Sequence, residues 1–201
     1  TRVKVQGPFK VRIATGVPTS VKASGSGAAL ANIEARVDGD MLTISPSGST
    51  WASASSSKQG PVEIVIGTRD LAAVTLNGSG SIAIDRVKGF EFLMTVLGAG
   101  SASVADAKVD RLTIGVAGTG SVAAAGKANE LNALLKGTSS IDTRALSAKN
   151  AKLSVDGGGT AALLVTQTAN VTGSGTGLVA FDGNPSCTLK LQGAGSVTGC
   201  R

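Results

Sequence analysis

The sequence predicts an all-β protein, a right-handed parallel β-helix of about seven rungs of about 20 residues each, with a β-rich N-terminal cap. Three observations support this prediction. A glycine-rich tetrapeptide recurs at nearly constant spacing, apolar residues alternate on both sides of it, and no proline occurs between Leu71 and Asn184. Because proline cannot donate a backbone hydrogen bond, its absence fits continuous strand pairing.

The tetrapeptide is Gly-x-Gly-Ser in its clearest copies, and its first residues step by 20, 20, 19, 20, 16 and 20. Glycine can adopt φ > 0 and lets neighbouring backbones approach closely, so we predict a tight corner at each copy. The predicted corner glycines are Gly78, Gly80, Gly98, Gly100, Gly118, Gly120, Gly137, Gly157, Gly159, Gly173, Gly175, Gly193 and Gly195. The fourth position is always Ser or Thr, which we interpret as stabilising the corner, a ligand-binding polar stripe being the alternative.

Apolar residues stand two and four positions before the first glycine in every copy. A spacing of two is that of a strand with one face turned inward. Two strands therefore flank each corner, and a third segment is expected to close the coil. Successive rungs should stack at about 4.8 Å.

The length fits one structural domain, with two regions inside it. Residues 1–70 do not keep the glycine register, and prolines separate their short alternating segments. We expect this region to cap the open first rung, because an exposed sheet edge promotes aggregation. Residues 71–201 are expected to form the β-helix.

The two cysteines, Cys187 and Cys200, flank the last corner. A metal pair would need further ligands, and the chain has no His. A redox pair would usually show Cys-x-x-Cys spacing. A structural disulfide is the favoured interpretation, and it implies an oxidising, extracytoplasmic compartment. No apolar run approaches the length of a transmembrane helix, so no membrane span is expected in this chain.

Catalytic chemistry finds little support in the sequence. Without His there is no Ser-His or Cys-His pair. We therefore expect no catalytic residue, no metal and no cofactor. A carbohydrate-active β-helix enzyme is the alternative, because Asp85 and Asp106 can fall on neighbouring rungs. Nucleic-acid binding is not expected, since aromatic residues make up 2% of the chain and no known motif is present.

The formal net charge is +6, and some basic residues recur at similar repeat positions. Lys88 and Lys108 follow their first glycine by ten residues, and Lys127 by nine. They can form a basic strip that attracts acidic polysaccharide or lipid headgroups, although a merely solvated corner is the simpler interpretation. The single tryptophan, Trp51, can stack on a sugar ring, but packing against the domain is favoured.

The passage from Leu71 to Ile82 runs Leu-Ala-Ala-Val-Thr-Leu-Asn-Gly-Ser-Gly-Ser-Ile. It resembles the bacterial family called "putative auto-transporter adhesin, head GIN domain", a domain of unknown function, in which such a passage follows a β-rich opening. The likeness extends over nearly the whole chain. It implies a right-handed β-helix in exported proteins of Gram-negative bacteria, and it supplies no catalytic or binding residues. The cysteine pair is not a defining feature of that family.

Three functional hypotheses remain. The first is an exported, non-enzymatic, adhesin-like binding or scaffold module at the cell surface or in the periplasm. Its partner would be a cell-surface polysaccharide or another surface protein. The second is the carbohydrate-active enzyme, and the third is a rod that associates with copies of itself.

Overall fold

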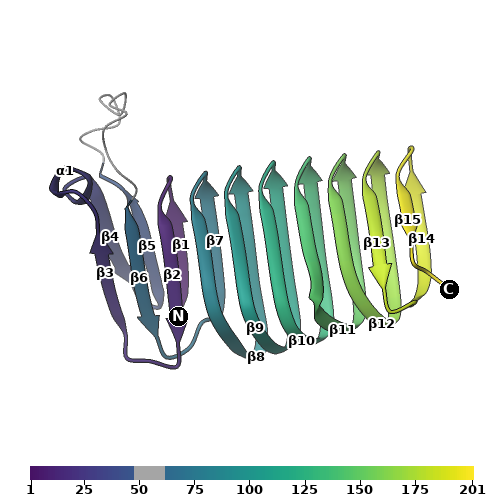
Figure 1. Ribbon diagram of the computed structural model, residues 1–201, viewed down its shortest axis with the longest axis horizontal. Helices are drawn as coiled ribbons and strands as arrows, with labels where there is room; N and C mark the ends of the chain where they lie inside the picture. Colours follow the sequence, from purple (N-terminus) through teal and green to yellow (C-terminus); the bar gives the residue numbers. More distant parts are fainter. Residues whose placement is uncertain (48–61) are drawn as a thin grey trace.

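The computed structural model describes residues 1–47 and 62–201, which form an elongated β-solenoid (Figure 1). One short helix is present in these residues, near the N-terminal end of the solenoid. The described elements are β1 (Arg2–Gln6), β2 (Lys10–Thr15), β3 (Ser20–Ser24), α1 (Gly27–Leu30), β4 (Ile33–Asp38), β5 (Met41–Pro46), β6 (Glu63–Thr68), β7 (Ala73–Gly78), β8 (Ser81–Gly98), β9 (Ser101–Gly118), β10 (Ser121–Gly137), β11 (Ser140–Gly157), β12 (Thr160–Gly175), β13 (Leu178–Asp182), β14 (Ser186–Gln192) and β15 (Ser196–Thr198).

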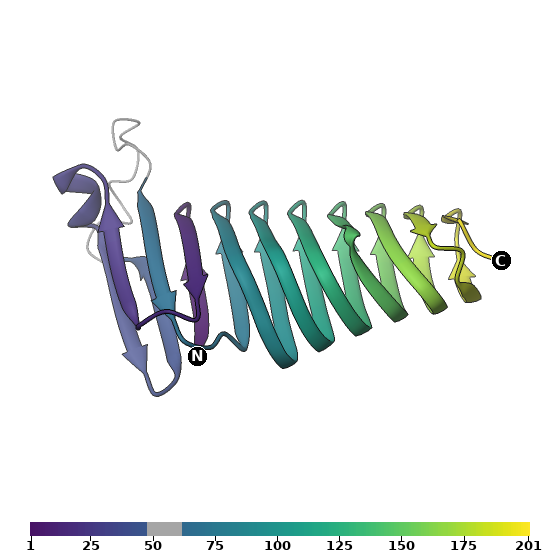
Figure 2. The same ribbon diagram turned by 60° about the horizontal axis from the view of Figure 1, so that its bottom comes forward.

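Each central coil, from β8 to β12, is built from one long strand folded back on itself. The strand β8 starts after one glycine corner, crosses one face, bends, and returns along the second face to the next corner (Figure 2). Its pairing with β9 extends from Ser81 opposite Ser101 to Gly98 opposite Gly118. The coil therefore has two sides, and the predicted third side is wrong. The residues expected there lengthen the two arms and form the bend between them. We call residues 86–90, 106–110 and 126–129 the opposite bend.

The inward residues of both arms fill one continuous core between the two faces. In β8 these include Ile82, Ile84, Phe92 and Met94, each no more than 2% exposed. The strands pair in parallel from coil to coil over about six turns, close to the predicted seven. The predicted parallel β-helix is confirmed.

The corners are tight because successive glycines stack directly on one another. At Gly118 the backbone has φ +110°, and a side-chain Cβ would lie 2.6 Å from the carbonyl oxygen of Gly98. The amide of Thr119 donates to that same oxygen at 3.0 Å. Glycine is required here by both the positive φ and the close approach of the coil below.

One predicted corner is wrong. Gly175, rather than Gly173, pairs with Gly157, and Gly193 stacks on Gly175. The first-glycine steps from Gly157 onward are therefore 18 and 18 (157 to 175 to 193), instead of 16 and 20. Gly173 lies within the strand, opposite Val155.

The same shift changes the predicted row of hydroxyl residues beside the corners. Thr176 lies within the corner itself, and Leu178 takes the place beside Thr160. Backbone amides make the contact between coils, as when Ser101 N–H donates to the oxygen of Gly80 at 3.0 Å.

The N-terminal region adds further coils to the same stack. The strands β1 and β2 pair in parallel with β7 and the first arm of β8, and Gly7 lies directly against Gly78 with φ +109°. Beyond them, β5 and β6 pair in parallel with β1 and β2. The outermost strands, β3 and β4, pair antiparallel with β6 and β5. We retain as a proposal that residues 1–70 act as the cap of the solenoid formed by residues 71–201.

The C-terminal coil carries the predicted disulfide. Cys187 in β14 is bonded to Cys200, which follows β15, and their Cα atoms are 5.7 Å apart. The bond links the two arms of the last coil. The prediction of a structural disulfide is confirmed.

Candidate functional site

Three lysines form one row at the opposite bend. Lys88 in β8 lies directly opposite Lys108 in β9, which lies directly opposite Lys127 in β10. All three residues are exposed. Because neighbouring strands are about 4.8 Å apart, positive charge repeats along the solenoid axis at about that step. We call Lys88, Lys108 and Lys127 the lysine row.

Among the described residues, only the central lysine of the row has an ionic partner. Lys108 Nζ lies 3.0 Å from a carboxylate oxygen of Asp106 on its own strand. For Lys88 and Lys127, no carboxylate oxygen lies within 4 Å among residues 1–47 and 62–201. The row ends at Ser147, which lies opposite Lys127 in the next coil. The row thus keeps a net positive charge.

A second row, immediately beyond the bend, alternates in sign. Glu91, Arg111 and Glu130 lie opposite one another in β8, β9 and β10. Arg111 Nε donates to Glu130 at 3.1 Å, and Lys152 Nζ donates to the other oxygen of Glu130 at 3.0 Å. These hydrogen bonds, that of Lys152 first, hold the pKa of Glu130 below its ordinary value. Together with Lys152, the alternating row has no net charge.

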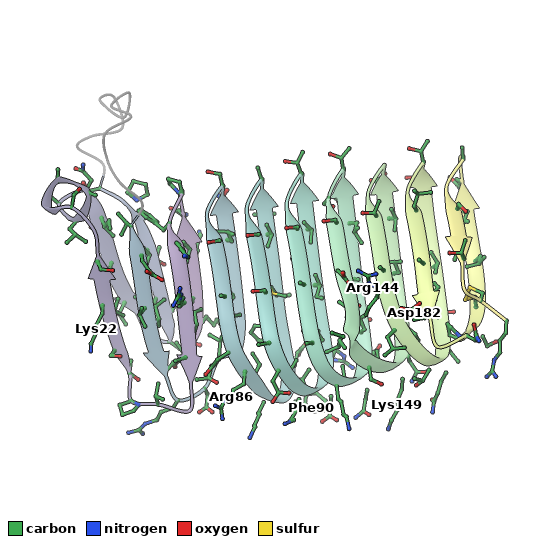
Figure 3. The ribbon with its side chains drawn as sticks, viewed as in Figure 1. Lys22, Arg86, Phe90, Arg144, Lys149 and Asp182 are labelled. Atoms are coloured by element: carbon green, nitrogen blue, oxygen red, sulfur yellow. A yellow bond between two sulfur atoms is a disulfide. The ribbon has the colours of Figure 1, made fainter. Side chains whose placement is uncertain are left out.

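An aromatic ring lies at the bend between the two rows. Phe90 is 68% exposed, and its ring centroid is 6.0 Å from the guanidinium carbon of Arg111. Figure 3 shows Phe90 on the lower edge of the solenoid, in line with Arg86 and Lys149. The residues at the same point of the next two coils, Asp110 and Asn129, are polar. Phe90 was missed by sequence reasoning, although an aromatic residue at an otherwise polar repeat position was a usable signal.

The face formed by the first arms carries mostly small side chains. Its outward positions in β8 to β10 are Ser or Ala, such as Ser103 and Ala123, apart from Asp85 in β8. In β11 the same face carries Arg144, whose guanidinium donates to both carboxylate oxygens of Asp142, at 3.0 and 2.6 Å. That hydrogen bonding holds the pKa of Asp142 below its ordinary value. Arg144 therefore lies on the face of the first arms (Figure 3) and is already paired.

The face formed by the second arms has several shallow, open depressions, and two of them bear on the question of an active site. One is lined by Thr113, Asn132, Leu134 and Lys152 among others, and it contains no carboxylate. The other lies where β1, β7 and β8 meet and holds Arg2, Lys4 and Glu91. In neither depression do acid and base groups gather as a catalytic set would require.

The acids proposed for an enzyme do not face one another. Asp106 lies opposite Arg86. Asp85 instead accepts the backbone N–H of Thr15 at 3.0 Å. Across the part of the chain that the structure describes, no three His, Cys, Asp or Glu side chains gather as metal ligands. Trp51, the proposed sugar-stacking residue, lies outside the described residues.

Comparison with known families now identifies the chain. Residues 1–185 match the family described as "Putative auto-transporter adhesin, head GIN domain". The chain belongs to this family. The resemblance noted in the Leu71–Ile82 passage is thereby confirmed. The match includes most of the solenoid and the whole lysine row, and it ends before the disulfide. In the described residues, no helix is long and apolar enough to cross a membrane.

Solved structures of similar fold come from Bacteroides and Parabacteroides species. A "putative adhesin" from Bacteroides fragilis is 18% identical, with a TM-score of 0.87, covering 98% of this chain and 90% of that one. A "putative lipid binding protein" from Parabacteroides distasonis is 16% identical with a TM-score of 0.74, and a "putative adhesin" from Parabacteroides merdae is 16% identical with a TM-score of 0.71. Both have the same two coverages of 98% and 90%. No curated protein matches the chain, and nothing in the comparisons supports an enzyme.

Proposed function

We propose that this chain is an exported, non-enzymatic binding module of a Gram-negative bacterium, adhesin-like in that it holds a partner at the cell surface. The partner is a cell-surface polysaccharide or another surface protein. The observation that carries the proposal is the register of the outward side chains. Equivalent residues of successive coils lie directly opposite one another and form rows along the solenoid axis, as in the lysine row and the alternating row.

A surface of this kind suits a partner that itself repeats. Each coil presents the same backbone frame, so a ligand unit bound on one coil has an equivalent place on the next. Several weak contacts along one rigid rod then act together, and their combined affinity exceeds that of a single contact. An enzyme instead needs one concave site with converging acid and base groups.

The family and the disulfide support the extracytoplasmic part of the proposal. The family carries the name adhesin, and two of the similar structures do so as well. The Cys187–Cys200 bond is of the kind that persists in oxidising compartments. The name of the Parabacteroides distasonis protein makes a lipid the second candidate partner.

The proposal is tested with disulfide-intact protein on an array of bacterial and host polysaccharides, neutral and acidic, and on whole bacterial cells. Saturable binding to a glycan or to the cell surface is the expected result. Absence of binding to every glycan and to cells, from protein that melts cooperatively, would overturn the proposal. Light scattering of the same sample determines whether the chain associates with itself. A self-assembling rod would form a defined oligomer and bind no glycan on the array.

A further inference from the structure

We propose that the lysine row and Phe90 form a binding site for a linear acidic polysaccharide that lies along the solenoid axis. This inference rests on the proposed function and names the surface and the ligand class. The row supplies three stacked cations, and the ring supplies an apolar contact beside them.

The row is electrostatically incomplete within the protein itself. Like charges directly opposite on neighbouring strands destabilise a sheet. Lys88, Lys108 and Lys127 are opposed in this way, and Asp106 offsets only the central one. An external chain that repeats a carboxylate or sulfate group along its length would neutralise this charge.

The alternating row shows that charged side chains in neighbouring coils can instead be paired within the protein. Glu91, Arg111 and Glu130 occupy the same three coils and place opposite charges next to one another. An anionic ligand gains nothing there, because Arg111 is already bonded to Glu130 at 3.1 Å. In β8 to β10, the positive charge at the bend that lacks a carboxylate partner in the described structure is therefore that of Lys88 and Lys127 in the lysine row.

Phe90 adds an apolar contact surface beside the lysine row. A phenylalanine at 68% exposure leaves most of its ring against water, which is unfavourable without a partner. The ring lies two residues from Lys88, at the end of the row in β8. A sugar bound through its acidic group at Lys88 would bring its C–H face within reach of this ring.

The shape and surroundings of the row favour a polysaccharide over a membrane. The row follows the narrow bend between the two faces, where Figure 3 shows the neighbouring side chains along the lower edge of the rod. Carboxylates flank it, from Asp106 on one side and from Asp110 and Glu91 on the other. A flat anionic bilayer would bring phosphate groups over these acids as well. A single polysaccharide chain can lie over the lysines alone.

The site is tested with polygalacturonate and dextran sulfate as acidic probes, uncharged dextran as the neutral probe, and phosphatidylglycerol-containing vesicles. The variant Lys88→Ser/Lys108→Ser/Lys127→Ser removes the row, and serine fits because Ser147 already occupies the next place in it. The matched control, Lys22→Ser/Lys136→Ser/Lys190→Ser, removes the same charge from exposed lysines elsewhere. Phe90→Ala tests the ring separately.

We expect wild type to bind an acidic probe, and the row variant to lose about tenfold or more in affinity with a shallower salt dependence. The control should stay within about twofold, and Phe90→Ala should weaken binding about threefold without changing the salt dependence. The row variant should melt no lower than wild type, because removing it relieves repulsion.

Equal losses in the row variant and the control would overturn the proposal, since binding would then follow net charge alone. It is also overturned if wild type binds only the vesicles, or no acidic probe at all. Binding of glycans or cells that the row variant leaves unchanged would refute the site while the proposed function stands. Failure to bind any glycan or any cell surface would remove both.

Discussion

Replacing Gly118 by alanine should destabilise the solenoid, whereas the same change at Gly115, three residues earlier in β9, should not. Gly118 has φ +110°, which costs an L-residue about 1–2 kcal/mol. Its new Cβ would lie 2.6 Å from the carbonyl oxygen of Gly98, a backbone atom of the coil below. Relieving such an overlap costs about 1–3 kcal/mol, so the total loss is about 2–5 kcal/mol.

Gly115 provides the matched control. A Cβ there meets only the side chain of Thr95, at an ordinary 3.8 Å, and no positive φ is involved. Alanine in a strand is favoured over glycine by about 0.5–1 kcal/mol, so this variant should be neutral or slightly stabilised. The two substitutions add the same atom to the same strand and should differ in sign.

Thermal unfolding followed by circular dichroism measures the difference. For a chain of this length, 1 kcal/mol shifts Tm by about 2–4 °C, so a loss of 3 kcal/mol in Gly118→Ala lowers Tm by about 6–12 °C. Hydrogen exchange should show the added opening in β8 and β9, next to the altered corner. If the two variants melt within about 2 °C of one another, the stacked-corner explanation is wrong.

Three further changes test other parts of the structure. Cys200→Ser should cost up to about 3 kcal/mol, as expected for the loop that the disulfide closes, and should raise hydrogen exchange mainly in the last coil; unchanged exchange there would contradict its role. Thr143→Val should raise stability by about 1 kcal/mol, because the buried hydroxyl of Thr143 has no hydrogen-bond partner in the described structure; a lower Tm would show that the hydroxyl is satisfied. The lowered pKa of Glu130 makes its stabilisation present at neutral pH and lost as the pH falls below about 4.5, so Glu130→Gln should lose less than about 1 kcal/mol at pH 7 and show a weaker decline under acid; parallel acid melting curves would refute this.

Much of the fold could be predicted because stacking imposes it on the sequence. Positions 98 and 118 must both be glycine, because the corner of each coil lies against the corner of the next. Glycine therefore recurs in the sequence every 20 residues. Inward residues such as Ile114 and Val116 must alternate because the coil has one core. The length of the arms carries no such signature, and so the two-sided coil was not predicted.

The register error at Gly173 has a local cause. Residues 173–177 run Gly-Ser-Gly-Thr-Gly, which offers two overlapping Gly-x-Gly choices. The corner is at Gly175 because Gly175 pairs with Gly157, and this pairing cannot be read from the sequence. At Gly7 the opposite occurs. A corner of the same backbone geometry carries Phe9 where most other corners have a second glycine, so the first coil was not predicted.

The candidate site could be predicted in part for the same reason. Lys88, Lys108 and Lys127 keep the repeat spacing, and so their alignment follows from the period once the bend is placed. That Lys88 and Lys127 have no ionic partner among the described residues does not follow, because Glu91 and Glu130 each lie only three residues away in the sequence. Phe90 has no counterpart in the other coils, and a search for repeats therefore does not find it.

The most direct test of binding along the opposite bend is a titration of ¹³C-methylated lysines by NMR, with polygalacturonate added to disulfide-intact protein. If the site is correct, the signals of Lys88, Lys108 and Lys127 shift together and saturate at one common affinity. Lys22, Lys136 and Lys190 stay in place. Shifts spread evenly over all the lysines, or confined to lysines outside the row, would contradict the account.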